Sequence, residues 1–312
     1  MKAVRIHNYG DASRLSYEDA PMPSISSNNE VLIRVVAASV NPVDWKIREG
    51  LLAQMIPYSL PLILGWDVSG VIEAVGSECS KFKVGDAVYS RPNIKRNGTY
   101  AEYVVIHEDE VAHKPKTISH IEAAALPLAG ITAWEAIFTT AQLKAGQSVL
   151  IHAGSGGVGC LAVQLAKSQG AYVIATTSAK NRAFVESLGA DQVVDYRSQR
   201  FEDVVSNVDV VFDTMGGDVQ ESSWSVLKPG GILVSIISPP STEKAAALGV
   251  RSAFVFIEPN AKILEELAGL VDAGKLRPII GAEFALQDIA KAHALSETGR
   301  TVGKIVLYVG LP

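Results

Sequence analysis

The chain has 312 residues, of which 48% are hydrophobic and 20% charged, and its formal net charge is −5. This length allows two domains with a sizeable core, and the absence of a basic block argues against nucleic acid as a main partner. Two cysteines, Cys79 and Cys160, are too few for a disulfide framework and are typical of a reducing compartment. No apolar run reaches the ~18 residues of a membrane span, and the N-terminus has no signal-like segment. We therefore expect a cytoplasmic protein with no membrane partner.

The first 120 residues contain short apolar segments that end at Gly, Pro or Asn. The N-terminus begins directly with such a segment, and turn sequences such as Val84-Gly85-Asp86 separate the others. Further predicted strands are 31–38, 68–75, 87–89 and 100–106. Short strands with frequent turns are typical of a compact antiparallel β-barrel.

The pattern changes at Ile121, where a helix is predicted through Trp134 to Phe138. Strands and helices then alternate, as a doubly wound parallel sheet of the α/β class requires. The predicted strands are 148–153, 171–176, 193–195, 208–213 and 231–236. The predicted helices between them are 158–168, 181–188 and 218–227. An amphipathic helix follows at 260–273, and the tail contains a helix at 286–296 and a final strand at 303–309.

A glycine-rich turn, Gly154-Ser-Gly-Gly-Val-Gly159, joins the first strand of this alternation to the helix that follows it. Glycines in this order allow a tight turn and a close approach of the backbone to a pyrophosphate, and the helix N-terminus adds partial positive charge. The turn therefore predicts a dinucleotide site. Its cofactor-binding candidates are Ser155, Gly156, Gly157, Val158 and Gly159.

The residues after the second of these strands indicate which dinucleotide binds. NAD sites place Asp or Glu about 20 residues after the turn to hold the ribose 2′-hydroxyl, whereas here no acidic residue occurs between the turn and Glu186. The strand runs instead into Thr177, Ser178 and Lys180, whose hydroxyls and positive charge suit a 2′-phosphate. We therefore predict NADPH as the cofactor. The alternative is that these are ordinary solvated residues, with Ser178 as the N-cap of the next helix.

Several segments, taken together, resemble the medium-chain dehydrogenase/reductase superfamily. They are Asn41–Trp45, Leu64–Gly70, Val84–Val88, Gly130–Trp134, Ala153–Gly159 and Gly303–Leu307, and they occur in the family's order along the chain. The resemblance implies an α/β protein whose GroES-like β-barrel catalytic domain is formed by residues 1–120 and 275–312. It also implies a Rossmann dinucleotide-binding domain, with its doubly wound parallel sheet, in residues 121–274.

Within this superfamily, the chain is similar to the zinc-independent quinone oxidoreductase branch. Zinc alcohol dehydrogenases carry Cys where this chain has Asn41 and His where it has Trp66, and neither an amide nor an indole replaces such a ligand. No metal is therefore expected. The branch implies reduction of quinones, or of the C=C bond of α,β-unsaturated carbonyls, by NADPH. The alternative is an NADP(H)-binding protein with a structural or regulatory role.

Four residues are candidates for the chemistry. Hydride addition to an enone leaves negative charge on the carbonyl oxygen, which then needs hydrogen-bond donors. Asn41 is a candidate donor, although Asn before Pro42 is also a common turn residue. Asp44 is expected to organise the site through hydrogen bonds. Tyr58 is a candidate proton donor, with packing at the barrel rim as the alternative, and the resemblance places Thr132 on the nicotinamide side of the site.

The resemblance also implies two further cofactor contacts and a mode of assembly. Tyr196 matches a residue that touches the adenosine phosphate, and Lys304 matches a cation near the cofactor, with a solvated strand start as the alternative for Lys304. Members of the superfamily commonly pair through an edge strand of the Rossmann sheet, so a homodimer is expected. Residues 251–257 are the candidate edge, because they alternate apolar residues with little charge.

Overall fold

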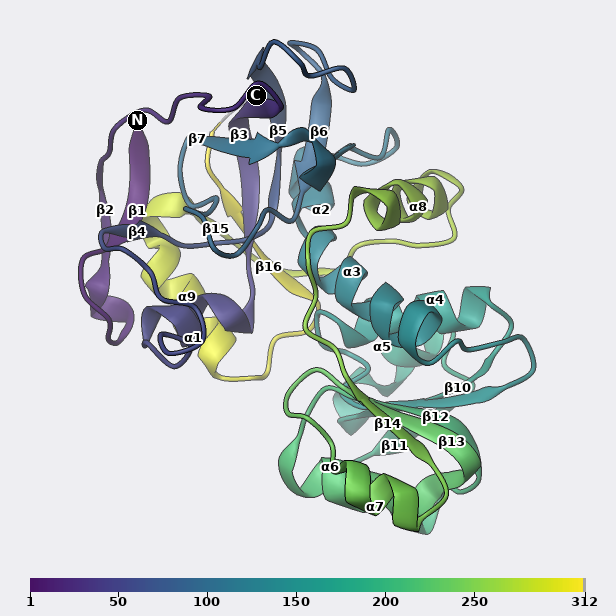
Figure 1. The fold of residues 1–312 in the computed structure, drawn as a ribbon. Helices are drawn as coiled ribbons and strands as arrows, with labels where there is room; N and C mark the ends of the chain where they lie inside the picture. Colours follow the sequence, from purple (N-terminus) through teal and green to yellow (C-terminus); the bar gives the residue numbers. More distant parts are fainter. Residues whose placement is uncertain (311–312) are drawn as a thin grey trace. The chain divides into compact units, whose positions relative to one another are not determined.

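The computed structural model describes residues 1–310, which form two compact units (Figure 1). The first unit contains residues 1–128, 258–274 and the chain from 278 onward. The second contains residues 129–257 and 275–277.

The first unit is built mainly on antiparallel strands. Its larger sheet runs in the order β15 (Ile280–Ala285), β16 (Lys304–Tyr308), β3 (Glu30–Val40), β5 (Val68–Val75), β6 (Ala87–Ser90) and β8 (Val111–His113), and β7 (Tyr103–His107) also pairs with β3. The smaller sheet runs in the order β2 (Leu15–Asp19), β1 (Lys2–Ile6) and β4 (Leu62–Ile63). Among the described strands of this unit, only β15 and β16 pair in parallel. Alternate residues of β3, including Val31, Ile33 and Val35, enter an apolar core, as the two-residue period of a strand requires.

Four helices belong to the first unit: α1 (Pro42–Arg48), α2 (His120–Ala124), α8 (Ala261–Asp272) and α9 (Ile289–Glu297). Helix α1 was not predicted from the sequence, in which a turn at Asn41-Pro42 was an alternative interpretation. Proline is well suited to the first position of a helix, where its missing N–H leaves no hydrogen bond unmade. Pro42 therefore begins α1, with Asn41 as its N-cap residue.

The boundaries of the units differ from the expected division at residues 120/121 and 274/275. Helix α2 packs against β3 and β5, so residues 121–128 belong to the first unit. Helix α8 packs against β8, and the Tyr89 hydroxyl donates a hydrogen bond to the Leu264 carbonyl of α8. Residues 258–274 therefore also belong to the first unit.

The second unit contains a six-stranded sheet in which all strands are parallel. The order is β11 (Gln192–Asp195), β10 (Tyr172–Thr177), β9 (Ser148–Ile151), β12 (Val208–Asp213), β13 (Leu227–Ser235) and β14 (Arg251–Phe254). Numbered along the chain, this is the 3-2-1-4-5-6 order of a doubly wound Rossmann sheet. Every residue of β12 is buried, as expected for a central strand with helices on both faces. The predicted fold class is confirmed.

The helices of the second unit include one that was not expected. Helix α3 (Pro127–Trp134) continues as a π-helix (Glu135–Thr140), and α4 (Gly159–Ser168), α5 (Arg182–Ser187) and α6 (Gly217–Ser223) connect the strands. Helix α7 (Thr242–Ala247) lies in a segment for which no helix was predicted. The Ser241 hydroxyl accepts a hydrogen bond from the Lys244 N–H and so satisfies the first turn of α7.

Short 3₁₀ helices complete the described structure; they are Ala12–Arg14, Glu108–Glu110, Ala179–Asn181, Phe201–Asp203, Trp224–Val226 and Leu286–Asp288. Within residues 1–310, no helix combines the length and the apolar character needed to cross a membrane.

Candidate functional site

The predicted glycine-rich turn lies between β9 and α4, and close packing explains its glycines. A Cβ atom on Gly159 would lie 2.2 Å from the Ala153 carbonyl oxygen, and one on Gly154 would lie 2.8 Å from the Cβ of Ala175. Both distances are too short for a side chain. The glycines therefore let the start of α4 pack directly against the end of β9, which leaves the helix N-terminus open to an anion.

The ends of β10 and β11 meet this turn. The Ser155 hydroxyl accepts hydrogen bonds from the Thr177 hydroxyl at 2.9 Å and from the Asn181 amide at 3.2 Å. The Tyr196 N–H donates to the Thr177 carbonyl at 3.2 Å. Because the carboxyl ends of parallel strands meet at one edge of a sheet, the structure brings together candidates that lie about 20 and 40 residues apart in sequence.

The charged residues at this edge are distributed as an anion site requires. Lys180 is exposed, and no carboxylate in the described chain lies within ion-pair distance of it. Ser178 is buried and precedes the 3₁₀ helix 179–181. Asp195, at the end of β11, accepts hydrogen bonds from the Arg197 N–H and the Ser198 hydroxyl. Its carboxylate is therefore bound to donors of the turn that follows β11.

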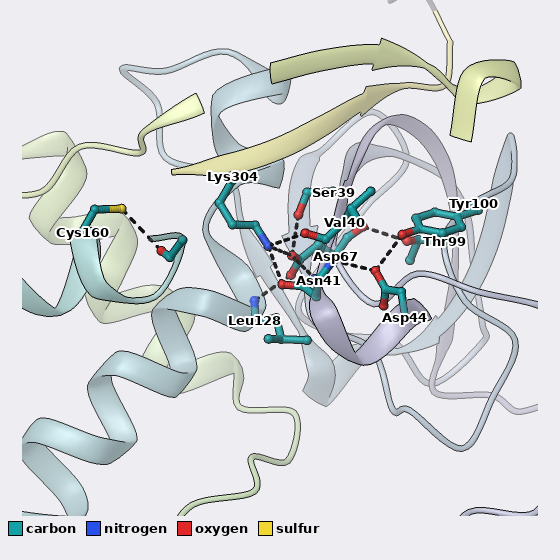
Figure 2. Close-up of polar contacts among 11 residues, drawn as sticks. Ser39, Val40, Asn41, Asp44, Asp67, Thr99, Tyr100, Leu128, Cys160 and Lys304 are labelled. Carbon is teal, nitrogen blue, oxygen red and sulfur yellow. Dashed lines mark hydrogen bonds and ion pairs between the residues drawn. The ribbon is translucent and has the colours of Figure 1, made fainter. Parts of the chain in front are cut away.

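A second group of candidates lies in the first unit, where Asp67 forms the centre of a buried polar cluster (Figure 2). Its Oδ2 accepts hydrogen bonds from the Ser39 hydroxyl at 2.6 Å, the Asn41 amide at 2.8 Å and the Lys304 ammonium at 3.2 Å. Its Oδ1 accepts from the Leu128 N–H at 2.6 Å. Asp67 therefore accepts hydrogen bonds from donors in β3, the N-cap of α1, β16 and the start of α3.

Lys304 contributes the positive charge of this cluster. Its ammonium group donates to Val40 O at 3.1 Å, to Asn41 Oδ1 and to Asp67 Oδ2. The residue is 4% exposed, so the alternative of a solvated strand start is wrong. An ammonium has three hydrogens, and all three have partners here. The geometry therefore makes Lys304 a counterion that positions Asn41, and it leaves no hydrogen of Lys304 for a cofactor phosphate.

Asp44 extends the cluster to Tyr100. The Asp44 Oδ2 atom accepts hydrogen bonds from the Asn41 N–H at 2.7 Å and from the Tyr100 hydroxyl at 2.6 Å. Its other oxygen is buried and has no hydrogen-bond partner among the described residues. Burial raises the pKa of Asp44 to about 7, and these two hydrogen bonds act in the opposite direction.

The remaining two chemical candidates are Tyr58 and Thr132. The Tyr58 hydroxyl donates to the Ile94 carbonyl at 2.7 Å, and the ring centroid lies 6.3 Å from that of Trp66. Burial raises the pKa of Tyr58. Thr132 is buried in α3, within the second unit. The structure therefore brings Asn41 and Asp44 together, whereas the Tyr58 hydroxyl is bonded to Ile94 and Thr132 belongs to the second unit.

Sequence reasoning did not single out Asp67 or Tyr100. Asp67 carried a usable signal, because it is a charged residue between Leu62–Trp66 and Val68, which are otherwise apolar or glycine. A lone charge inside an apolar strand is rarely buried without a partner. Tyr100 carried no such signal, since an aromatic residue in a strand is ordinary.

The donor set does not fit zinc. The two positions at which zinc alcohol dehydrogenases carry ligands hold Asn41, whose amide is bound to Lys304 and Asp67, and Trp66, which is buried and offers only an indole N–H. Over residues 1–310, no three His, Cys, Asp or Glu residues are grouped so that they could hold a metal ion. The cation beside Asp67 is the ammonium of Lys304.

Comparison with known proteins gives a consistent set of similarities. Residues 27–116 match the alcohol dehydrogenase GroES-like domain, and residues 188–307 match the zinc-binding dehydrogenase family. The chain is 38% identical to 2-methylene-furan-3-one reductase of Solanum lycopersicum, over 99% of this chain and 79% of that protein. It is 36% identical to the chloroplastic NADPH-dependent alkenal/one oxidoreductase of Arabidopsis thaliana, over 99% and 79%. The solved quinone oxidoreductase of Coxiella burnetii is 38% identical, with a TM-score of 0.93 and 99% of both chains covered.

Proposed function

Because the chain belongs to the medium-chain dehydrogenase/reductase superfamily, we propose that it is an NADPH-dependent oxidoreductase that reduces quinones or the C=C bond of α,β-unsaturated carbonyls. One observation carries the proposal: the glycine-rich turn meets a strand end that offers Thr177, Ser178 and Lys180 but no free carboxylate. The names of similar proteins, which include an NADPH-dependent alkenal/one oxidoreductase and a quinone oxidoreductase, support the same substrate class.

The residues of the second unit hold the cofactor. The backbone of Ser155–Gly159 at the start of α4 would bind the pyrophosphate. Thr177, Ser178, Lys180 and Tyr196 would lie around the adenosine 2′-phosphate: the Ser178 and Tyr196 hydroxyls and the Lys180 ammonium would donate hydrogen bonds to it, whereas the Thr177 hydroxyl donates to Ser155 and would hold the turn in place. When bound, NADPH supplies the hydride. Thr132 would face the nicotinamide side of the bound cofactor.

The residues of the first unit serve the substrate. An amide nitrogen carries two hydrogens, and Asn41 gives one of them to Asp67. The second is the donor that Asn41 offers to the substrate oxygen as charge develops on it. Lys304 and Asp67 hold this amide in one orientation, and Asp44 holds the backbone of Asn41. Tyr58 orients the 91–94 segment through its bond to Ile94.

The reaction is proposed to need no metal, because Asn41 and Trp66 offer no zinc ligands. We expect steady NADPH consumption with a small panel of quinones and enones, and the same rate after exhaustive dialysis against a chelator. Activity that chelation removes and zinc restores would contradict the zinc-free assignment. NADPH binding without turnover on any panel member would favour the alternative, an NADP(H)-binding protein with a structural or regulatory role.

We expect NADPH to bind at least tenfold more tightly than NADH, since charge-assisted hydrogen bonds to phosphate contribute roughly 1.5–3 kcal/mol. Lys180→Ala should weaken NADPH binding by a comparable factor and leave NADH binding unchanged, as measured by fluorescence titration. Lys262→Ala, which removes an exposed lysine from the first unit, is the control and should change neither constant. Equal losses for both cofactors in Lys180→Ala would refute the 2′-phosphate assignment.

The protein is proposed to form a homodimer through β14, which lies at the edge of the parallel sheet. Phe254 and Phe256 are 40% and 45% exposed there, and an uncovered apolar edge strand promotes aggregation unless it is paired. Light scattering should give twice the chain mass of 33.2 kDa. Val255→Lys should produce monomers or insoluble protein; a Val255→Lys dimer of normal stability would place the interface elsewhere.

A cytoplasmic location is proposed from the composition of the chain and its cysteine content. The Arabidopsis relative is chloroplastic by name, so fractionation of the native host decides this point.

A further inference from the structure

Arg91 is a buried arginine whose guanidinium group has unused hydrogen-bond donors. The residue is 2% exposed. Its Nε and Nη1 atoms are buried, and neither has a hydrogen-bond partner among residues 1–310. A guanidinium carries five N–H donors and stays protonated in proteins, so burying it unpaired costs free energy. Such a cost is typical of a group kept for a ligand rather than for stability.

The acidic groups around Arg91 are committed elsewhere. Burial lowers the pKa of Arg91, whereas the charges of Glu258, Asp67 and Glu110 raise it, so all three lie near enough to act on it. None forms an ion pair with Arg91 within 4 Å. Asp67 is bound by Lys304 and its other donors, and Glu110 accepts from the Asn93 N–H at 2.9 Å. These three carboxylates therefore stabilise the positive charge of Arg91 without forming an ion pair with its guanidinium.

The sheet register places Arg91 beside the Asn41–Asp67–Lys304 cluster. Val68 of β5 pairs with Ser90 of β6 in antiparallel register. Asp67 immediately precedes one of these partners and Arg91 immediately follows the other. Burial raises the pKa of Tyr58, whose ring lies near Trp66, and the charge of Arg91 acts in the opposite direction. Arg91 thus belongs to the first unit, with Asn41, whereas the candidates for the cofactor phosphates, Ser155–Gly159 and Lys180, belong to the second.

We propose that Arg91 is a catalytic residue that binds the substrate oxygen on which negative charge develops during reduction. This inference rests on the proposed function. When hydride adds to the β-carbon of an enone, the C=C electron pair moves towards the carbonyl and the oxygen becomes an enolate; a proton taken up at the α-carbon then restores the carbonyl. The N–H groups of a guanidinium donate charge-assisted hydrogen bonds to such an oxyanion. Substrates of this site carry an exposed carbonyl or quinone oxygen next to the reducible bond.

Arg91→Met tests the proposal, because methionine fills the buried space and removes the charge. We expect kcat/KM for enones and quinones to fall by ~10²–10³-fold, the loss seen when one oxyanion donor is removed. The dissociation constant for NADPH should stay within twofold, and the melting temperature should equal or exceed that of the wild type, since an unpaired buried charge is gone. Arg91→Lys should recover only part of the activity, because an ammonium lacks the planar donor geometry of a guanidinium.

Arg96→Met is the matched control. Arg96 lies five residues on, is partly exposed and donates to Glu30 at 2.6 Å. Its loss should lower the melting temperature and leave kcat/KM unchanged, which is the reverse of the Arg91→Met pattern. Turnover of Arg91→Met within threefold of the wild type would overturn the proposal. A tenfold higher dissociation constant for NADPH in Arg91→Met would also overturn the proposal, because the guanidinium would then bind a cofactor phosphate.

A binding experiment separates this proposal from the proposed function. A wild-type protein that reduces no member of the panel would refute the proposed function alone. Binding of trans-cinnamate, whose carboxylate takes the position of the enone oxygen, would then test whether Arg91 binds an anion. We expect cinnamate to raise the melting temperature of the wild type and of Arg96→Met but not of Arg91→Met. Equal stabilisation of all three proteins would overturn the assignment of Arg91.

Discussion

Replacing Asp67 by asparagine is expected to lower the free energy of unfolding by about 3–5 kcal/mol, the usual cost of breaking a buried ion pair from one side. Asp67 is fully buried and Lys304 is 5% exposed at its side chain. Asparagine would leave the Lys304 charge uncompensated. It would also turn one acceptor into an NH₂ group that faces donors such as the Leu128 N–H or the Ser39 hydroxyl. Urea unfolding followed by fluorescence measures the loss.

Two controls isolate the buried charge as the cause. The same change in an exposed pair, Asp109→Asn opposite Lys81, should cost no more than about 1 kcal/mol. The double variant Asp67→Leu with Lys304→Met should lose less than the sum of the two single variants, because removing both charges leaves no unpaired ion. Additive losses would show that Asp67 and Lys304 do not act as a pair.

Gly159→Val is expected to reduce kcat/KM by at least ~100-fold, the effect of displacing reacting groups by about 1 Å. Its Cβ would lie 2.2 Å from the Ala153 carbonyl oxygen and 2.9 Å from the carbonyl carbon. Backbone atoms of a buried strand end cannot move aside, so the start of α4 must shift away from the position at which it binds pyrophosphate. We expect weaker binding of NADPH and of NADH alike, and a loss of roughly 1–3 kcal/mol of stability from overpacking.

The control for Gly159 is a glycine with free space around it. Gly269 lies inside α8, and a Cβ there would meet no atom within 4 Å. Gly269→Ala should raise the free energy of unfolding by about 0.5–1 kcal/mol and leave both cofactor constants unchanged. Wild-type affinity for NADPH in Gly159→Val, measured by titration calorimetry, would show that the turn does not hold the pyrophosphate.

The sequence by itself determined the class of the fold, because strand and helix periodicities are local properties. The alternation after Ile121 predicted the strands that form the parallel sheet, and their observed order is that of a Rossmann unit. The glycine-rich turn was recognisable for the same reason: its chemistry lies within six consecutive residues. Local signals were ambiguous at Asn41-Pro42, where a turn was an alternative and the structure begins α1.

Only the tertiary structure decided what surrounds Asn41. Its partners Asp67 and Lys304 lie 26 and 263 residues away in sequence, and the pairing of β3 with β5 and β16 brings them together. Sequence patterns report which face of a strand is apolar, but they do not report which strands become neighbours. Burial of Lys304 follows from that pairing, and the position of Arg91 follows from the pairing of β5 with β6. A side chain loses water only when distant segments enclose it.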